Sequence, residues 1–173
     1  MLESIKRVLV SYIVRLLPET SFFTFKRFLY QSIGHEIGNN TRICSSARIL
    51  GAGKLIVGNN VWIGPEVLIA CSSKIIIEDN VDIAPRVYIG TGTHNIGDIK
   101  GRMAGTGLNK NIIIGKGTWL CANVSIMPGV VIGKMNIINA GSVVTKATEN
   151  NMLLAGIPAK VIKNLREEKK HVE

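Results

Sequence analysis

The sequence predicts an all-β protein: a parallel β-helix of six-residue repeats with a helical cap at its N-terminal end. Three observations support this class. Six-residue blocks, each led by an aliphatic residue that a small or acidic residue follows, recur between residues 37 and 149. Hydrophobic residues make up 46% of the chain but aromatics only 5%, which suits a core of stacked branched side chains. Helical periodicity occurs in the residues that precede the first block.

The blocks have two spacings. The leading residues Ile37, Val57 and Ile77 lie twenty positions apart, so each early coil has eighteen residues and a two-residue insertion at a corner. From residue 114 the spacing is six, with the leading residues Ile114, Leu120, Ile126, Ile132, Ile138 and Val144. Gly or Asn-Asn at the corners tolerates the positive φ of tight turns. We expect about five coils, stabilised mainly by stacking between repeats.

Residues 1–36 are expected to form a separate amphipathic helical segment. Its polar strip consists of Glu3, Arg7, Ser11 and Arg15, and Pro18 ends the first helix. The segment is too short and too charged to span a bilayer, and it lacks the cleavage site of a signal peptide. Two interpretations remain open: a cap over the open end of the β-helix, and an interfacial helix that contacts the membrane through residues 1–33.

Residues 37–149 form the expected β-helix, and residues 150–173 form a C-terminal cap. After Val144 the repeat decays, and the charged tail from Val161 is predicted to end the chain as a short helix. The three cysteines, Cys44, Cys71 and Cys121, include no CxxC pair and indicate neither a disulfide framework nor a zinc site. We expect buried, inert thiols and a cytoplasmic protein.

The repeat is interrupted by a loop that we expect to be ejected from the coil at about residues 91–111. A β-helix gains no packing from a Gly-rich loop of this size, and long loops on rigid scaffolds are usually functional or disordered. The loop opens with His94, and histidine is the natural general base near neutral pH. The sequence therefore predicts that His94 is catalytic.

A series of motifs follows this loop. They are residues 114–123 with Trp119, residues 127–133 (Met-Pro-Gly-Val-Val-Ile-Gly), residues 140–146 (Ala-Gly-Ser-Val-Val-Thr-Lys) and residues 155–160 (Ala-Gly-Ile-Pro-Ala-Lys). With these motifs the chain resembles, over about residues 34–163, the hexapeptide-repeat acetyltransferase superfamily and, within it, galactoside and maltose acetyltransferases. The N-terminal segment and the Arg-Met-Ala-Gly-Thr-Gly loop are similar to the branch that acetylates capsular and other exported polysaccharides.

The resemblance implies a left-handed coil and a homotrimer with sites between neighbouring subunits. It also implies metal-free acetyl transfer from acetyl-CoA to a hydroxyl of a sugar or polysaccharide precursor, with His94 as the base. A sugar hydroxyl is a poor nucleophile until a base removes its proton, which is typically worth about 10²–10⁴ in rate. Backbone N–H groups at the coil corners would stabilise the developing oxyanion.

The resemblance further implies the contacts with acetyl-CoA. Trp119 would line the cleft for pantetheine or a sugar face, unless it is an outward aromatic at a trimer seam. The backbones of Ala122 and Ala140 would contact the pantetheine arm. The cationic residues expected at the phosphate-bearing nucleotide end, unless they form only a solvated basic tail, are Lys146, Lys160 and Lys163.

The chain departs from the galactoside pattern at two positions. Asn95 follows the catalytic histidine where many of those enzymes have Pro, and Gly64 stands where they place a sugar-contacting Asn. Asp82 and Asp98 are candidate acidic partners of the histidine, with a backbone carbonyl as the alternative. Asp82 is also a candidate acceptor contact, and Arg102 either clamps an acidic or phosphorylated acceptor or anchors the loop.

The net charge of +9 is best explained by attraction to CoA phosphates, acidic glycans or the anionic cytoplasmic face of a membrane. Nucleic-acid binding is excluded because the aromatics are not interleaved with the basic residues and no reader motif occurs. A metal-dependent hydratase would need several converging His ligands, and the coil region has one. The alternatives that remain are a non-catalytic trimeric scaffold and an N-acetyltransferase acting on an amino sugar.

Overall fold

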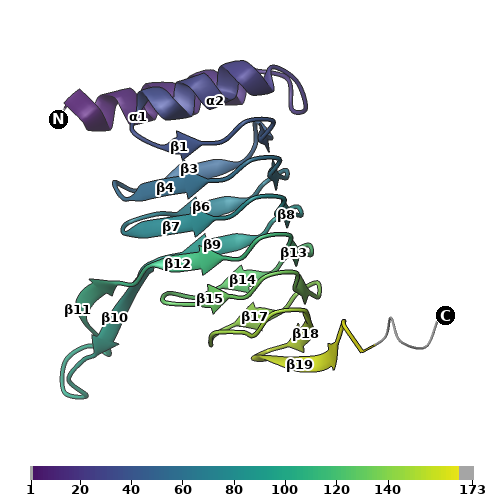
Figure 1. Cartoon of the computed structure of the whole chain (residues 1–173). Coiled ribbons are helices and arrows are strands. Elements are labelled where there is room, and N and C mark those ends of the chain that lie inside the picture. Colours follow the sequence, from purple (N-terminus) through teal and green to yellow (C-terminus); the bar gives the residue numbers. More distant parts are fainter. Residues whose placement is uncertain (1, 168–173) are drawn as a thin grey trace.

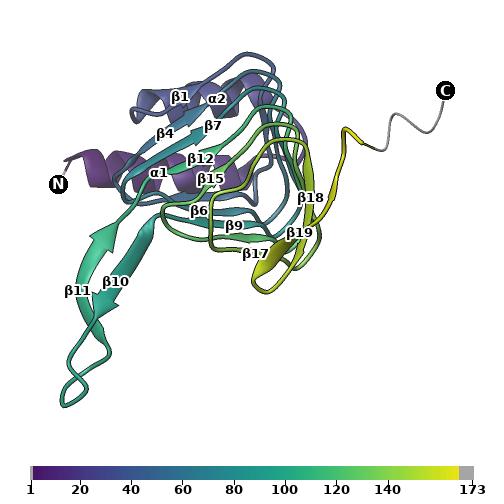
Figure 2. The same ribbon diagram turned by 60° about the horizontal axis from the view of Figure 1, so that its bottom comes forward.

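The computed structural model describes residues 2–167 and shows a triangular coil of short strands that two helices cover at one end (Figure 1). The parallel β-helix that the repeat predicts is confirmed. Figure 2 looks along the coil and shows its three sides, with the cap behind them.

Each side of the coil is one sheet. The first sheet contains β1 (Glu36–Ile37), β4 (Lys54–Val57), β7 (Lys74–Ile77), β12 (Ile112–Ile114) and β15 (Val131–Ile132). The second sheet contains β2 (Arg42–Ile43), β5 (Trp62–Ile63), β8 (Asp82–Ile83), β13 (Trp119–Leu120), β16 (Ile137–Ile138), β18 (Met152–Gly156) and β19 (Ala159–Asn164). The third sheet contains β3 (Arg48–Leu50), β6 (Leu68–Ala70), β9 (Tyr88–Gly90), β14 (Ser125–Ile126) and β17 (Val143–Val144).

The core is a set of columns of identical or similar side chains. In the first sheet Val57 pairs with Ile77 and Ile77 pairs with Ile114, and all three are buried. Neighbouring strands lie about 4.8 Å apart, so a branched side chain directly contacts its equivalents in the coils on either side. The aliphatic residue that leads each six-residue block therefore supplies the core, as the sequence predicts.

The corners rely on residues that accept a left-handed backbone. Asn40, Asn60 and Asn80 have φ values of 57°, 55° and 56°, and they stack at the same corner in successive coils. The Asn60 side-chain amide donates to Asn80 Oδ1 at 3.2 Å. The same conformation occurs at Glu66 and Arg86, which the pattern of Gly and Asn corners does not predict. Arg86 Nε and Glu66 Oε2 lie 3.5 Å apart and form an ion pair.

The N-terminal cap consists of α1 (Leu2–Leu16) and α2 (Phe23–Ser32). The coil and the cap bury Val10, Val14, Leu29 and Tyr30 between them. Lys26 is also fully buried and donates to the carbonyl oxygens of the α1–α2 connection, on Pro18 and Glu19, at 3.0 and 2.9 Å. In the part of the chain that the structure describes, no helix is long and apolar enough to cross a bilayer.

The interruption of the repeat is an antiparallel hairpin, β10 (Gly92–Ile96) and β11 (Ala104–Asn109), that projects away from the coil (Figures 1 and 2). It leaves β9 of the third sheet and returns to β12 of the first. The hydroxyl oxygen of Thr91 accepts from the N–H groups of Ser72 and Ser73 at 2.9 and 3.1 Å, and the Lys110 N–H donates to the Thr91 carbonyl at 2.9 Å. These bonds fix the base of the hairpin to the coil.

The C-terminal cap is a β-hairpin, whereas the sequence predicts a helix in this segment. From Ala159 to Asn164 the chain forms β19, which pairs antiparallel with β18. The predicted helix from Val161 is therefore wrong as far as residue 167, because residues 165–167 form a turn after the strand. The physical reason is that β18 would otherwise leave an unpaired strand edge, and β19 satisfies its backbone groups. The rest of the predicted helix, residues 168–173, lies outside the described residues.

Candidate active site

His94 lies on the exposed part of β10, where its ring is oriented by one backbone group. Its Nδ1 atom lies 2.8 Å from the carbonyl oxygen of Gly105 on β11. A carbonyl oxygen can only accept a hydrogen bond, so Nδ1 must carry the hydrogen. The neutral ring then has its free lone pair on Nε2, which is the arrangement that a general base requires.

A register shift in the hairpin brings this carbonyl to the ring. His94 pairs with Gly107 and Ile96 pairs with Ala104, so the two residues Gly105 and Thr106 on β11 oppose a single residue on β10. Such a bulge redirects the groups beside it and is common next to active sites.

The loop beyond β10 leaves no room for a side chain at Gly97. A Cβ atom there would lie 2.1 Å from the carbonyl oxygen of Arg102, closer than a Cβ atom can approach. The hairpin therefore needs a glycine at this position to pack its two arms together.

The acidic candidates do not contact His94. The Asp98 carboxylate accepts from the N–H of Lys100 at 2.9 Å and so holds the loop tip. Asp82 lies on β8 in the second sheet, where it pairs with Trp62 and Trp119. The backbone carbonyl of Gly105, and neither Asp82 nor Asp98, is therefore the partner that orients the His94 ring. Arg102 is exposed in the loop tip between the two strands of the hairpin.

Two of the residues predicted to contact acetyl-CoA lie at stacked corners of the coil, and the third lies on the strand that precedes one of these corners. Trp119 is 49% exposed on β13 and lies beside Asp82 of the preceding coil. Ala122 and Ala140 occupy the corners that follow β13 and β16, between the second and third sheets. The Gly141 N–H donates to the Ala122 carbonyl at 3.0 Å, so these corners stack on each other.

The predicted nucleotide-end lysines gather at the C-terminal end of the coil. Lys160 and Lys163 lie on β19, and Lys146 follows β17; all three side chains are exposed. Lys146 also lines a hollow of about 420 Å³ together with Ala159 and Val161. β18, the partner of β19, pairs with β16, the strand that the Ala140 corner follows.

A single chain does not bring all the predicted residues together. The hairpin that carries His94 leaves the coil at the corner between the third and first sheets, whereas Trp119 and Asp82 lie on the second sheet. Figure 2 shows the hairpin and the β18–β19 end on different sides of the coil.

The described residues contain no group of three or more His, Cys, Asp or Glu side chains placed to hold a metal ion. All three cysteines are buried, and burial raises the pKa of each thiol, that of Cys44 to about 11. The thiols are therefore protonated near neutral pH and poor nucleophiles.

Comparison with known proteins supports the repeat and the fold. Residues 111–146 match the family model for the bacterial transferase hexapeptide (six repeats). A stretch of 60 residues, 35% of the chain, is 43% identical to the galactoside O-acetyltransferase of Escherichia coli K12 and covers 30% of that protein. The chain thus spans about a third of the length of the curated relatives that it matches.

Solved structures match over nearly the whole chain. A galactoside acetyltransferase in complex with coenzyme A has a TM-score of 0.78 and 25% identity, over 98% of this chain and 84% of that one. A maltose O-acetyltransferase from Clostridium difficile 630 has a TM-score of 0.67 and 26% identity, over 92% of this chain and 84% of that one. Together with the repeat motif, these matches show that the chain is similar to hexapeptide-repeat acetyltransferases in its repeat and in its fold.

Proposed function

We propose that the protein is an acetyl-CoA-dependent O-acetyltransferase that transfers an acetyl group directly to a hydroxyl of a sugar or polysaccharide precursor. The observation that carries this proposal is the hydrogen bond from His94 Nδ1 to the Gly105 carbonyl, because in the neutral ring it places the lone pair on Nε2, on an exposed hairpin. A non-catalytic scaffold has no use for this arrangement. The coenzyme A bound to the matched galactoside acetyltransferase supports the choice of donor.

Acetyl-CoA, when bound, supplies the acetyl group as a thioester. His94 Nε2 takes the proton of the acceptor hydroxyl as the hydroxyl oxygen attacks the acyl carbon. Backbone N–H groups at the coil corners are fixed donors for the oxyanion that develops. His94 then returns its proton to the departing sulfur, so that the products are an acetyl ester and the free thiol of CoA.

The donor site that we propose runs along the alanine corners. Trp119 and the backbones of Ala122 and Ala140 contact the pantetheine arm, and the cationic residues Lys146, Lys160 and Lys163 attract the phosphates. Because His94 projects from a different corner, we propose a homotrimer in which the hairpin of one subunit reaches the donor site of its neighbour.

The acceptor, we propose, lies between the hairpin and the second sheet. Asp82 and Trp119 are neighbours on that sheet, and a carboxylate beside an aromatic surface suits a sugar. Arg102 at the loop tip provides a cation for an acidic acceptor.

We place the enzyme in the cytoplasm, in peripheral contact with the membrane through residues 1–33. The membrane contact is proposed because α1 and α2 expose many apolar side chains.

Calorimetric titration of acetyl-CoA into the purified protein, with CoA in a parallel titration, tests the proposal. We expect saturable binding of one molecule per chain, followed by acetylation in a screen of neutral, acidic and amino sugars. Absence of binding by a folded trimer would contradict the enzyme and favour the scaffold. Acetylation of amino sugars alone would favour N-transfer.

A further inference from the structure

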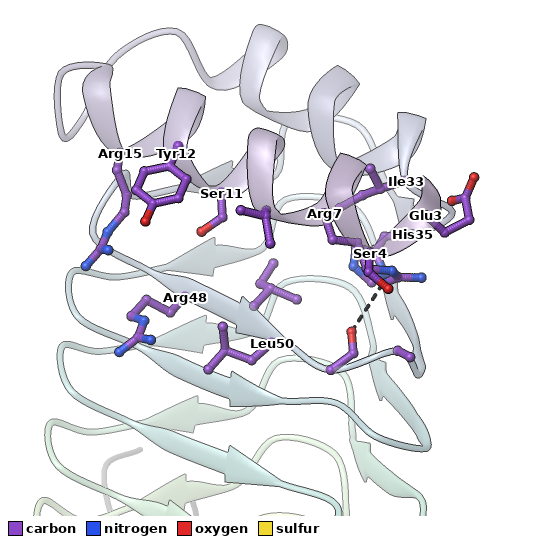
Figure 3. A pocket seen from close by; sticks show the side chains of 14 residues that line it. Glu3, Ser4, Arg7, Ser11, Tyr12, Arg15, Ile33, His35, Arg48 and Leu50 are labelled. Atoms are coloured by element: carbon purple, nitrogen blue, oxygen red, sulfur yellow. Dashed lines mark hydrogen bonds between the residues drawn. The ribbon is translucent and has the colours of Figure 1, made fainter. Parts of the chain in front are cut away.

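A groove of about 530 Å³ separates α1 from the third-sheet strand β3 (Figure 3). Arg7, Ser11 and Arg15 line it from α1, and Arg48 lines it from β3. Apolar side chains complete the lining, among them Ile33, Ile49 and Leu50. The site proposed for acetyl transfer uses none of these residues.

The groove has an excess of cationic groups. Of the charged side chains that line it, three are arginines and only Glu3 is acidic, and Glu3 is already paired with Lys6 at 3.0 Å. Arg7 donates to the Gly51 carbonyl at 3.3 Å. Within the described residues, Arg15 and Arg48 have neither a hydrogen bond nor an ion pair through their guanidinium groups. Like charges in one groove repel, and an anion with several oxygen atoms relieves that repulsion.

The side of α1 that faces away from the buried Val10 and Val14 is apolar and exposed to solvent. At 100° per residue the buried Val10 and Val14 point toward the coil, and the apolar residues on the other side are Ile5, Val8, Leu9, Tyr12 and Leu16. Leu16 is 86% exposed and Tyr12 is 64% exposed. On α2, Phe25 and Phe28 are exposed as well. We call the five exposed apolar side chains of α1 the apolar face.

The apolar face and the groove are continuous, because Val8 and Tyr12 belong to both. A ligand that occupies the groove at its cationic lining can thus extend an apolar part over the outside of the cap. Contiguous exposed apolar side chains with a basic border are typical of surfaces that bind membranes.

We propose that the groove binds the phosphate headgroup of an anionic phospholipid, whose acyl region lies against the apolar face. Guanidinium groups match phosphate oxygens through paired N–H donors, and the Ser11 and Tyr12 hydroxyls add neutral donors. A soluble phosphate compound would leave the apolar face in water. A second copy of the cap would bring two sets of unpaired arginines together.

Sedimentation with lipid vesicles tests this site on the whole 173-residue chain without acetyl-CoA, so the result does not depend on the proposed acetyl transfer. The vesicles contain phosphatidylglycerol with phosphatidylcholine, or phosphatidylcholine alone. We expect binding to the anionic vesicles only. Each basic side chain at an anionic surface strengthens binding about fivefold, so Arg15→Gln with Arg48→Gln should weaken vesicle binding about twenty-five-fold. The matched control, Lys116→Gln with Lys134→Gln, removes the same charge at a distant corner and should bind like the unchanged protein.

A charge-preserving pair separates a headgroup site from general attraction. Arg15→Lys with Arg48→Lys keeps the charge but loses the forked donors, and we expect several-fold weaker vesicle binding. Binding equal to that of the unchanged protein would overturn the headgroup site in favour of diffuse electrostatics.

Two other outcomes would overturn the choice of ligand. One is saturable binding of sn-glycerol 3-phosphate in solution with no binding to anionic vesicles, which would mark a site for a soluble phosphate compound. The other is dissociation of the assembly in the Arg15→Gln, Arg48→Gln variant, seen by analytical ultracentrifugation, which would make the groove a contact between copies of the chain. Leu9→Ser with Leu16→Ser, which alters only the apolar face, should weaken vesicle binding while the arginines remain.

Discussion

The chemistry that we propose depends on one side chain and one carbonyl group. His94 has no carboxylate partner in the hairpin, and the Gly105 carbonyl fixes its tautomer instead. A neutral carbonyl orients the ring without stabilising the imidazolium as strongly as a carboxylate would. In the proposed mechanism, His94 therefore depends on the orientation of its ring more than on a neighbouring charge.

Replacing His94 by Ala should lower turnover by about 10²–10⁴, because the acceptor hydroxyl loses its base. The affinity for acetyl-CoA should stay nearly the same, since the predicted donor contacts lie on other elements. Steady-state kinetics measure the turnover, and calorimetry of the same preparation measures the affinity for acetyl-CoA. A variant that keeps most of its turnover would remove His94 from the mechanism.

Replacing Lys160 by Ala should weaken CoA binding about fivefold, as expected for an exposed charge contact. The dependence of the dissociation constant on salt should also become shallower, because one cation no longer meets the phosphates. Lys74→Ala, which removes an exposed lysine from the first sheet, is the matched control. If the salt dependence of Lys160→Ala and of the control is the same, Lys160 does not contact CoA.

Among individual residues, the sequence indicates His94 as a candidate, because the break in a strict repeat can be seen in the sequence itself. Its catalytic role stays a prediction. The sequence could not identify the Gly105 carbonyl, since that contact depends on a register shift inside the hairpin. Backbone groups also carry no residue-specific signal. Asp98 was a reasonable candidate by spacing, yet its carboxylate is used by the turn at the loop tip.

At the scale of elements, the hairpin β10–β11 can be tested apart from the coil. Gly97→Ala should reduce turnover strongly without changing the melting temperature of the coil, because the added Cβ would meet the Arg102 carbonyl at 2.1 Å. Gly101→Ala is the matched control in the same loop, since its nearest neighbouring atom would lie 3.8 Å away. Turnover and thermal unfolding are measured for both. Equal activity of the two variants would show that the packing of the hairpin does not support the site.

The contact between the cap and the coil should depend on pH through His35. This residue is 5% exposed, its Nδ1 accepts from the Leu55 N–H at 3.4 Å, and its ring lies 6.4 Å from that of Tyr30. Burial, assisted by the charge of Arg7, lowers the pKa of His35 to about 4. In the unfolded chain the pKa is about 6.5, so below that pH the unfolded state binds a proton that the folded state excludes.

The free energy of unfolding should therefore fall as the pH decreases from about 6.5 to about 4, by up to about 3 kcal/mol from this residue. Urea titrations across this range measure it. His35→Asn keeps a hydrogen-bond acceptor but does not titrate, and it should give a flatter pH dependence. The same slope in both proteins would mean that His35 does not control the stability of the cap.

Elements of the coil were predictable because each block repeats the same local pattern. The C-terminal strand β19 was not predictable from the sequence. Val161 and its neighbours lie in a charged segment that lacks the alternation of apolar and polar residues typical of a strand. Their pairing is decided by the free edge of β18, which is a tertiary feature. The hairpin was expected as an ejected loop, but its strand pairing could not be derived from a Gly-rich sequence.

For the whole molecule, the separation of His94 from the alanine corners makes a sharp prediction about assembly. The mass in solution should be three times the 18.8 kDa of one chain. His94→Ala and Ala140→Trp, which places a bulky ring on the proposed donor path, should each be inactive alone. Refolding them together should restore about a quarter of the activity, if each site takes one part from each of two neighbours.

The control is a mixture of the two separately folded proteins, which should stay inactive until subunits exchange. No recovery in mixed trimers would place both parts of the site in the same subunit. The sequence could predict the coil but not this arrangement. Repeats that contact only their neighbours specify the fold locally, whereas subunit contacts depend on outward side chains that follow no period.

The hairpin has a consequence for how such a protein can change over evolutionary time. β9 and β12, the strands that flank it, pair in register with the coils on both sides, so the coil bridges the excursion as if it were an ordinary corner. Lengthening, shortening or exchanging the excursion leaves every stacked column intact. New acceptors can therefore be explored by altering an appendage, without repeating the search for a stable fold.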